Sequence, residues 1–162
     1  MMHSSSRRHK RSYSRSHTKT KTRKHHGGGG GAVTQKSFDN IIKSMLETLM
    51  SIKLYHWNTY SYSTHKATDD IYDSLSDNMD KYAEIMIGKS DGKYRIHAND
   101  FKMLKVDGIN NNKDMVNKVK NLINQLNKFH SGLNGVEYSD VANVRDEIVG
   151  DLNTFLYLLT LK

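Results

Sequence analysis

The sequence predicts an all-α protein: a four-helix bundle with a long crossover connection between its second and third helices, preceded by a disordered basic tail. Apolar residues recur every three or four positions in four segments of residues 34–162, which is the spacing of one helical face. The chain contains no proline, so long helices are not interrupted. Residues 1–31 contain almost nothing that could be buried, which is typical of a disordered segment.

The first 33 residues form a tail whose charge separates it from the expected helical domain, residues 34–162. The tail holds nine of the 25 Lys and Arg residues and no acid, so the domain holds 25 − 9 = 16 basic and 17 acidic residues. Five glycines, Gly27–Gly31, are expected to act as a flexible hinge. The basic residues of the tail are Arg7, Arg8, Lys10, Arg11, Arg15, Lys19, Lys21, Arg23 and Lys24. Basic residues spread along a disordered arm predict contacts with DNA phosphates and no base-specific readout; a nuclear-localisation or solubilising tail is the alternative.

Composition also excludes several classes of protein. There is no cysteine, so disulfides and cysteine-ligated zinc or iron–sulfur sites are excluded. No apolar run approaches the length of a membrane span, and no apolar stretch follows the basic start of the chain as in a signal peptide. We therefore expect a soluble, intracellular protein without a membrane partner, which could associate with DNA in a nucleoid, a nucleus or a virion.

The first two predicted helices are joined by a short polar turn. The first helix is expected over residues 37–58, where Phe38, Ile42, Met45, Leu49, Ile52 and His56 follow helical spacing. Ser37 or Asp39 could cap its start. The second helix is expected over residues 65–87 and should end at Gly88, because glycine often terminates helices.

A connection of about 24 residues separates the second helix from the third. This is long for a structureless loop, so a short helix is expected near residues 98–105. The third helix is expected over residues 113–130 and the fourth over residues 140–161. Four helices with the longest connection in the middle describe the ferritin-like pattern of connections.

The second helix carries a stripe of ionisable residues that is separate from its apolar face. At about 100° per residue, His65, Asp69, Asp80 and Glu84 fall within about 100° of one another, and the apolar side chains lie largely opposite. His65 with Asp69, and Asp80 with Glu84, are neighbours one turn apart and each pair could share an ion. A solvated acidic face is the alternative, and Asp73 and Asp77 on the same side would suit either interpretation.

One helix cannot bring both pairs to a single ion. Asp69 and Asp80 are eleven residues apart, which is about 16 Å along a helix. An antiparallel copy of the helix, packed across a two-fold axis, would set His65 and Asp69 of one subunit against Asp80 and Glu84 of the other. His56, near the end of the first helix, is either a further ligand or a hydrogen-bonded core histidine.

Three short motifs resemble the signature of the Dps-like miniferritins, which belong to the ferritin superfamily. They are His-Trp-Asn at residues 56–58, His-x3-Asp-Asp-x-Tyr at residues 65–72 and Asp-x-x-Ala-Glu at residues 80–84. The last helix, with Asp151-Leu152 and an aromatic-Leu end, is similar too. The family usually has about three more residues between its two histidines than the eight that separate His56 from His65 here.

The resemblance implies a site for iron between two-fold-related subunits, either di-iron or mononuclear. Its ligands and catalytic residues would be His56, His65 and Asp69 from one subunit and Asp80 and Glu84 from the other, with Trp57 as a neighbouring packing or electron-transfer residue. The family oxidises Fe(II), often with hydrogen peroxide, and stores the ferric product in hollow dodecamers. Several members bind DNA through basic tails. Zinc could occupy the same ligands without turnover.

Other functions remain open at this point. An ordinary ferritin site needs Glu-x-x-His on two helices, and no Glu-x-x-His occurs in the chain. An architectural DNA-packaging protein would use the helical body only to oligomerise and many tails to bind DNA avidly, without iron turnover. A monomeric helical adaptor with a solvated acidic helix is a third hypothesis.

Overall fold

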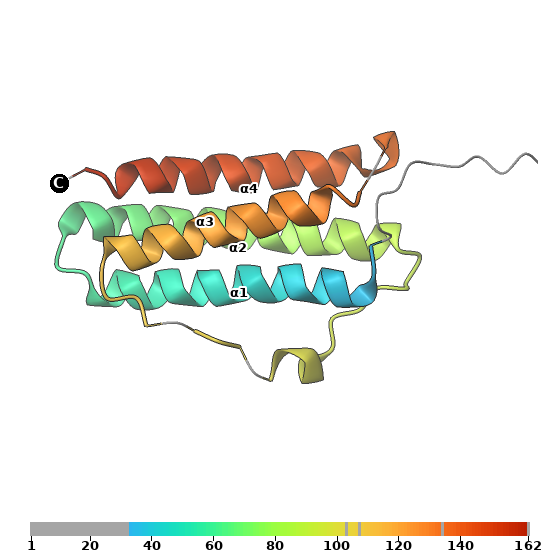
Figure 1. Cartoon of the computed structure of the whole chain (residues 1–162), viewed down its shortest axis with the longest axis horizontal. Helices are drawn as coiled ribbons and strands as arrows, with labels where there is room; N and C mark the ends of the chain where they lie inside the picture. The colour runs from blue at the N-terminus through green and yellow to red at the C-terminus, as the bar shows by residue number, and fades with distance from the viewer. Residues whose placement is uncertain (1–32, 103, 107, 134, 162) are drawn as a thin grey trace, which may run out of the picture.

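The computed structural model describes residues 33–102, 104–106, 108–133 and 135–161, and over these residues the protein is all-α (Figure 1). The secondary structure consists of α1 (Gln35–Asn58), α2 (Tyr62–Lys89), the 3₁₀ helix η1 (Ala98–Phe101), α3 (Asn112–His130), the 3₁₀ helix η2 (Val136–Tyr138) and α4 (Ser139–Leu158). No β-strand occurs in the described residues. The predicted fold class is therefore confirmed as all-α. The tail assigned to residues 1–33 lies outside the described part except for Val33.

Helix α1 begins earlier than predicted because a different residue caps it. The side chain of Thr34 accepts a hydrogen bond from the backbone N–H of Ser37, and the Ser37 hydroxyl accepts one from the backbone N–H of Thr34. This reciprocal capping box satisfies two donors that the helix itself cannot pair. Ser37 therefore lies inside the helix at its third position, and neither it nor Asp39 is the capping residue.

Helix α2 extends beyond the predicted range at both ends. Ser61 caps its start by accepting a hydrogen bond from Thr64 N–H, so the helix begins at Tyr62 and the turn after α1 is short. The helix continues through Gly88 to Lys89, and the chain first adopts positive φ angles after it at Asp91 and Gly92. The predicted stop at Gly88 was wrong because the left-handed conformation that favours glycine occurs four residues later.

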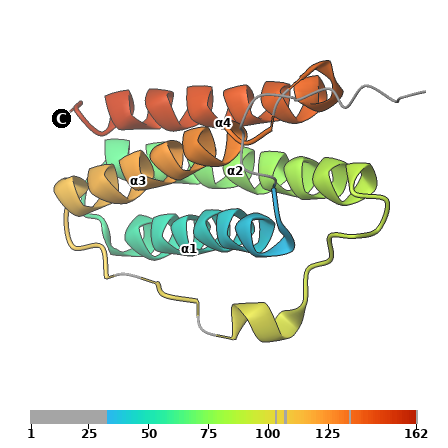
Figure 2. The same ribbon diagram turned by 45° about the vertical axis from the view of Figure 1, so that its right-hand side comes forward.

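The connection between α2 and α3 is attached to the start of α1. The ring of Tyr94 stacks on Phe38 at 5.3 Å between centroids, and the Tyr94 hydroxyl donates to the carbonyl of Val33. The Gln35 side chain bonds both the backbone N–H and the carbonyl of Arg95. In Figures 1 and 2 this connection returns along the α1 side of the bundle. The expected short helix is present as η1, which is shorter than predicted.

The last two helices lie close to their predicted ranges. Asn111 caps α3 by accepting from the backbone N–H of Asp114. Helix α4 follows η2 directly and ends at Leu158, three residues before the predicted end, where the backbone N–H of Leu159 bonds the carbonyl of Phe155. The range was overestimated because Leu159 is buried like a helical residue although it follows the helix.

Each helix packs against two others, in the pairs α1–α2, α2–α4, α4–α3 and α3–α1. Helices α2 and α3 run in the same direction, and α1 and α4 run in the opposite one (Figures 1 and 2). The fully buried side chains at the centre are mostly aliphatic or aromatic: Phe38, Met45, Ile52, Leu75, Tyr82, Met86, Met115, Leu122, Leu126, Ile148, Leu152 and Phe155. No described helix is long and apolar enough to cross a membrane.

Candidate functional site

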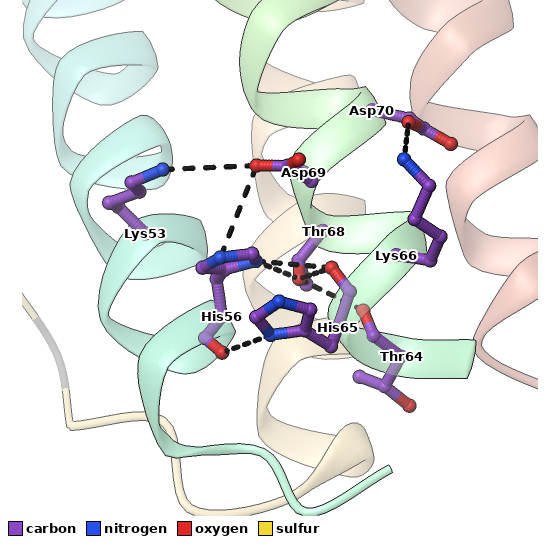
Figure 3. Close-up of polar contacts among 8 residues, drawn as sticks. All are labelled: Lys53, His56, Thr64, His65, Lys66, Thr68, Asp69 and Asp70. Carbon is purple, nitrogen blue, oxygen red and sulfur yellow. Dashed lines mark hydrogen bonds and ion pairs between the residues drawn. The ribbon is translucent and has the colours of Figure 1, made fainter. Parts of the chain in front are cut away.

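The turn between α1 and α2 brings two of the predicted ligands together. His56 lies in the last turn of α1 and His65 in the first turn of α2, so the short turn places them opposite each other. Their imidazole rings stack with centroids 3.8 Å apart and an interplanar angle of 25° (Figure 3). The eight-residue spacing, shorter than in the Dps-like family, therefore does not keep the two histidines apart.

Each of the two histidines is held by the backbone of the other. The Nδ1 atom of His56 lies 3.1 Å from the carbonyl oxygen of His65, and the Nδ1 atom of His65 lies 3.1 Å from the carbonyl oxygen of His56. Because a carbonyl oxygen can only accept, each Nδ1 carries the proton. In the neutral tautomer each Nε2 atom then keeps its lone pair, which is the form that binds metals.

Thr68 supports this arrangement from the next turn of α2. Its hydroxyl is fully buried, lies 2.8–2.9 Å from the carbonyls of His65 and Thr64, and is 3.1 Å from the Nδ1 atom of His56. The hydroxyl can donate to one of these carbonyls and accept from His56 Nδ1 at the same time. His56 is thus a buried, hydrogen-bonded histidine whose Nε2 atom lies nearest to the Asp69 carboxylate, at 4.0 Å.

Asp69 lies within reach of an ion held by His56. Its Oδ1 atom is 4.0 Å from His56 Nε2, too far for a hydrogen bond. Metal–nitrogen and metal–oxygen bonds are about 2.0–2.2 Å long, so two ligands of one ion can be separated by up to about 4.2 Å. The side chain of Asp69 is 45% exposed, so an ion could reach it from outside.

A lysine that sequence reasoning missed stands beside this carboxylate. Lys53 Nζ lies 3.9 Å from Asp69 Oδ1 (Figure 3). It also lies 4.6 Å from the centre of the Tyr72 ring. Its ammonium group opposes the approach of a metal cation until it moves away. Lys53 and His56 are three residues apart on one helix. This spacing predicts that their side chains are neighbours and could have indicated the lysine beside the site.

The other predicted ligands are not part of this group. Asp80 and Glu84 lie further along α2, are exposed, and form no hydrogen bond or ion pair with any described residue. Within one chain, the described residues contain no group of three or more His, Asp and Glu side chains that could hold a metal. The structure therefore stacks His56 on His65, places Asp69 4.0 Å from His56 alone, and leaves Asp80 and Glu84 apart.

An exposed apolar strip on α1 borders the site. Met50, Leu54 and Trp57 are 40%, 37% and 65% exposed. Their i, i+4, i+7 spacing places them on one face of the helix, and the ammonium of Lys53 lies 6.0 Å from the Trp57 ring. Sequence reasoning treated Trp57 as a neighbour of the ligands and overlooked the strip, although its spacing was visible.

A second polar pair is buried inside the bundle. The hydroxyl of Tyr82 lies 3.0 Å from Nε2 of His130, and Tyr82 is inaccessible to solvent. Burial lowers the pKa of His130 to about 4, with a smaller contribution from the charge of Arg145. Burial also raises the pKa of Tyr82, so the phenol is the donor and the neutral imidazole the acceptor.

The nine basic residues predicted to bind DNA lie outside the described residues, so DNA binding by the tail remains a prediction.

A family described as "Family of unknown function (DUF5856)" matches residues 56–159. The chain belongs to this family. Within the DUF5856 region lie His56, His65, Asp69, Asp80 and Glu84, whereas the tail and most of α1 precede it.

A protein of Enterobacteria phage T4, named "Uncharacterized 14.6 kDa protein in mobD-ri intergenic region", is 31% identical over 121 residues. The matched region covers 72% of this chain and 86% of the phage protein. No solved structure matches the chain.

Proposed function

We propose that this DUF5856 protein is a Dps-like miniferritin that oxidises Fe(II) at a site between two subunits and binds DNA through its basic tail. The observation that carries the proposal is the reciprocal pairing of His56 and His65. It fixes both rings, directs both Nδ1 protons to carbonyl oxygens and leaves the Nε2 atom of His56 4.0 Å from Asp69 Oδ1.

The arrangement of the helices supports the ferritin-like part of this proposal. The long connection joins α2 and α3, which run in the same direction, while the short turns join the antiparallel pairs α1–α2 and α3–α4 (Figure 1). One long crossover between two helical hairpins is the connectivity of ferritin-like bundles. Such folds place ligands on helices, which hold them more rigidly than loops do.

A second copy of the chain would complete the site. Asp80 is about 16 Å along α2 from Asp69, so only another subunit can bring Asp80 and Glu84 to His65 and Asp69. The strip formed by Met50, Leu54 and Trp57 adjoins the histidine pair and would be buried by that subunit. A two-fold dimer would then contain two equivalent sites, and larger assemblies such as dodecamers would be built from these dimers.

The residues present suit Fe(II) as a substrate. Two imidazoles and three carboxylates form a mixed set of ligands with a net negative charge, which favours the ferric product over the ferrous substrate. The overall reaction with peroxide would convert two Fe(II), one hydrogen peroxide and two protons into two Fe(III) and two waters. Lys53 would have to turn away from Asp69 when iron enters, so a cation of the protein would be replaced by the substrate cation.

Anaerobic mixing with Fe(II) followed by peroxide tests the enzymatic part. We expect the full chain to raise the rate of ferric absorbance above that in buffer, and the double variant His65→Ala/Asp80→Ala to lose the increase. Asp73→Ala/Asp77→Ala is the matched control, because both acids are exposed on the same helix and are not predicted ligands. Equal rates for buffer, the full chain and both variants would refute oxidation at this site.

The alternative is an architectural DNA-packaging protein whose helical body only oligomerises. The ammonium of Lys53 beside Asp69 favours it, because this cation already balances the carboxylate without a metal. A relative in phage T4 also suits a role in a virus particle. This function predicts DNA retention that falls with salt, needs the basic residues of the tail, and is unchanged by metal chelation. A single-subunit mass in solution would exclude both the shared site and the avid tails.

A further inference from the structure

The four helices divide by charge into two layers. The packed pair α2 and α4 holds ten acidic and four basic residues, a balance of 4 − 10 = −6. The packed pair α1 and α3, together with residues 90–111, holds eleven basic and six acidic residues, a balance of 11 − 6 = +5. In Figure 2 these connecting residues pass on the side of α1 that faces away from α4. The nearly neutral body is therefore polarised, although its total charge hides this.

Three of the eleven basic residues of this layer lie on one face of α3. Among the exposed side chains of α3 are Lys113, Asn117, Lys120, Asn124, Asn127 and Lys128. At about 100° per residue they fall within about 100° of one another, opposite the buried face of the helix. We call these six residues the Lys/Asn stripe. It contains no acid, because Asp114, the one acidic residue of α3, lies beside it and accepts from the backbone of Asn110.

The lysines of the stripe differ from those of α2 in their partners. On α2, Lys66, Lys81 and Lys89 form ion pairs with Asp70, Glu147 and Asp140 respectively, at 3.1–3.5 Å. In contrast, Lys113, Lys120 and Lys128 have no carboxylate partner among the described residues. Their charge is thus available to an external anion, and no ion pair has to be broken first.

From the polarised layers and the three unpaired lysines of the stripe, we propose that the Lys/Asn stripe of α3 is a second DNA-contacting surface, which binds the phosphate backbone of duplex DNA. The inference rests on the DNA-binding part of the proposed function and does not depend on iron. Lysine and asparagine donors are the groups that contact phosphate oxygens without reading sequence. The stripe carries no exposed apolar side chain, as the core of a protein interface would.

The dimensions and position of the stripe suit this ligand. Lys113 and Lys128 are 15 residues apart, about 22 Å along the helix, whereas one turn of duplex DNA spans about 34 Å. The stripe could therefore follow phosphates over part of one turn. Helix α1 begins at the end of the bundle where α3 ends (Figure 1), so the basic tail joins the body at that end of the stripe.

Salt-dependent binding of the full chain to a duplex oligonucleotide of random sequence tests the proposal. The stripe variant carries Lys113→Gln, Lys120→Gln and Lys128→Gln, and the matched control carries Lys66→Gln, Lys81→Gln and Lys89→Gln on the acidic layer, so both lose three charges. Each phosphate contact contributes about 0.9 to the slope of log affinity against log salt. We expect the slope of the stripe variant to fall by up to about 2.7, and that of the control to stay within about 0.5 of the parent.

A variant with all nine basic tail residues changed to Gln separates the stripe from the tail. If it still binds DNA and the stripe substitutions then abolish binding, the stripe is a DNA surface of its own. Equal slopes for the parent, stripe and control chains would overturn the proposal, while loss of binding in the tail variant would still support DNA binding by the tail. A lower mass of the stripe variant in light scattering, with an unchanged slope, would assign the stripe to contacts between copies and would also overturn it.

Discussion

Replacing His130 with Gln should remove one source of the acid sensitivity of the bundle. The imidazole of His130 is 9% exposed and accepts from the Tyr82 hydroxyl at 3.0 Å. Burial lowers the pKa of this group from 6.5 to about 4, and the nearby Arg145 guanidinium adds to the effect. Glutamine can accept the same hydrogen bond through its Oε1 atom but does not titrate in this range.

The direction of the pH dependence of stability follows from the lowered pKa of His130. As the pH falls through 6.5 the unfolded chain takes up a proton at His130, whereas the folded chain does so only near pH 4. The contribution is therefore complete above pH 6.5 and is lost as the pH falls from 6.5 towards 4. Between pH 7.5 and 5.0 the full shift would amount to about 2 kcal/mol, and partial solvent screening reduces this to about 1 kcal/mol.

Urea unfolding followed by circular dichroism at pH 7.5 and pH 5.0 measures this effect. We expect the parent chain to lose about 1 kcal/mol more than His130→Gln between the two pH values. His97→Gln is the control, because His97 is exposed in the connection before η1. The same pH dependence in the parent and in His130→Gln would refute the idea that His130 is held neutral by burial.

Three further changes test the fold by the same unfolding measurement. Thr34→Ala removes the capping box of α1 and should cost about 1 kcal/mol; no loss would mean that the cap is replaced by water. Leu126→Ala opens a cavity at a residue with no exposed surface and should cost about 2–5 kcal/mol, whereas Leu161→Ala at a 45% exposed position should cost less than about 0.5 kcal/mol. Gly92→Ala should cost about 1 kcal/mol because its φ is +77°, and Gly108→Ala, where a Cβ meets nothing, should cost less.

Most of the fold could be predicted from the helical periodicity of the sequence. Apolar residues three and four positions apart define the buried faces of all four helices, and the absence of proline allowed those helices to be long. The ends were less accurate, because several polar residues near each end can act as caps. Thr34 caps α1 where Ser37 or Asp39 was expected, and a choice of this kind depends on which side chain reaches a free N–H group.

The candidate site, too, could be predicted only in part from the sequence. Helical angles within α2 were sufficient to place His65, Asp69, Asp80 and Glu84 on one side of that helix, and the structure leaves Asp80 and Glu84 exposed there. They did not predict Lys53 beside Asp69, because this contact joins two helices. The intersubunit site and the tail contacts stay predictions, tested by the iron and DNA experiments above.

The sequence by itself determined that the chain is helical, where its helices lie and that its positive charge is concentrated in the tail. These are properties of residues close together in the chain, and regular helical geometry turns their spacing into faces. The tertiary structure decided that His56 and His65 hold each other across a short turn, and that Tyr82 pairs with His130, 48 residues away. It also decided which lysines form ion pairs. The lysines of α2 pair with carboxylates on the same helix or on α4, whereas the three lysines of the α3 stripe have no carboxylate partner among the described residues. Such contacts depend on how helices pack against one another, which no local spacing specifies.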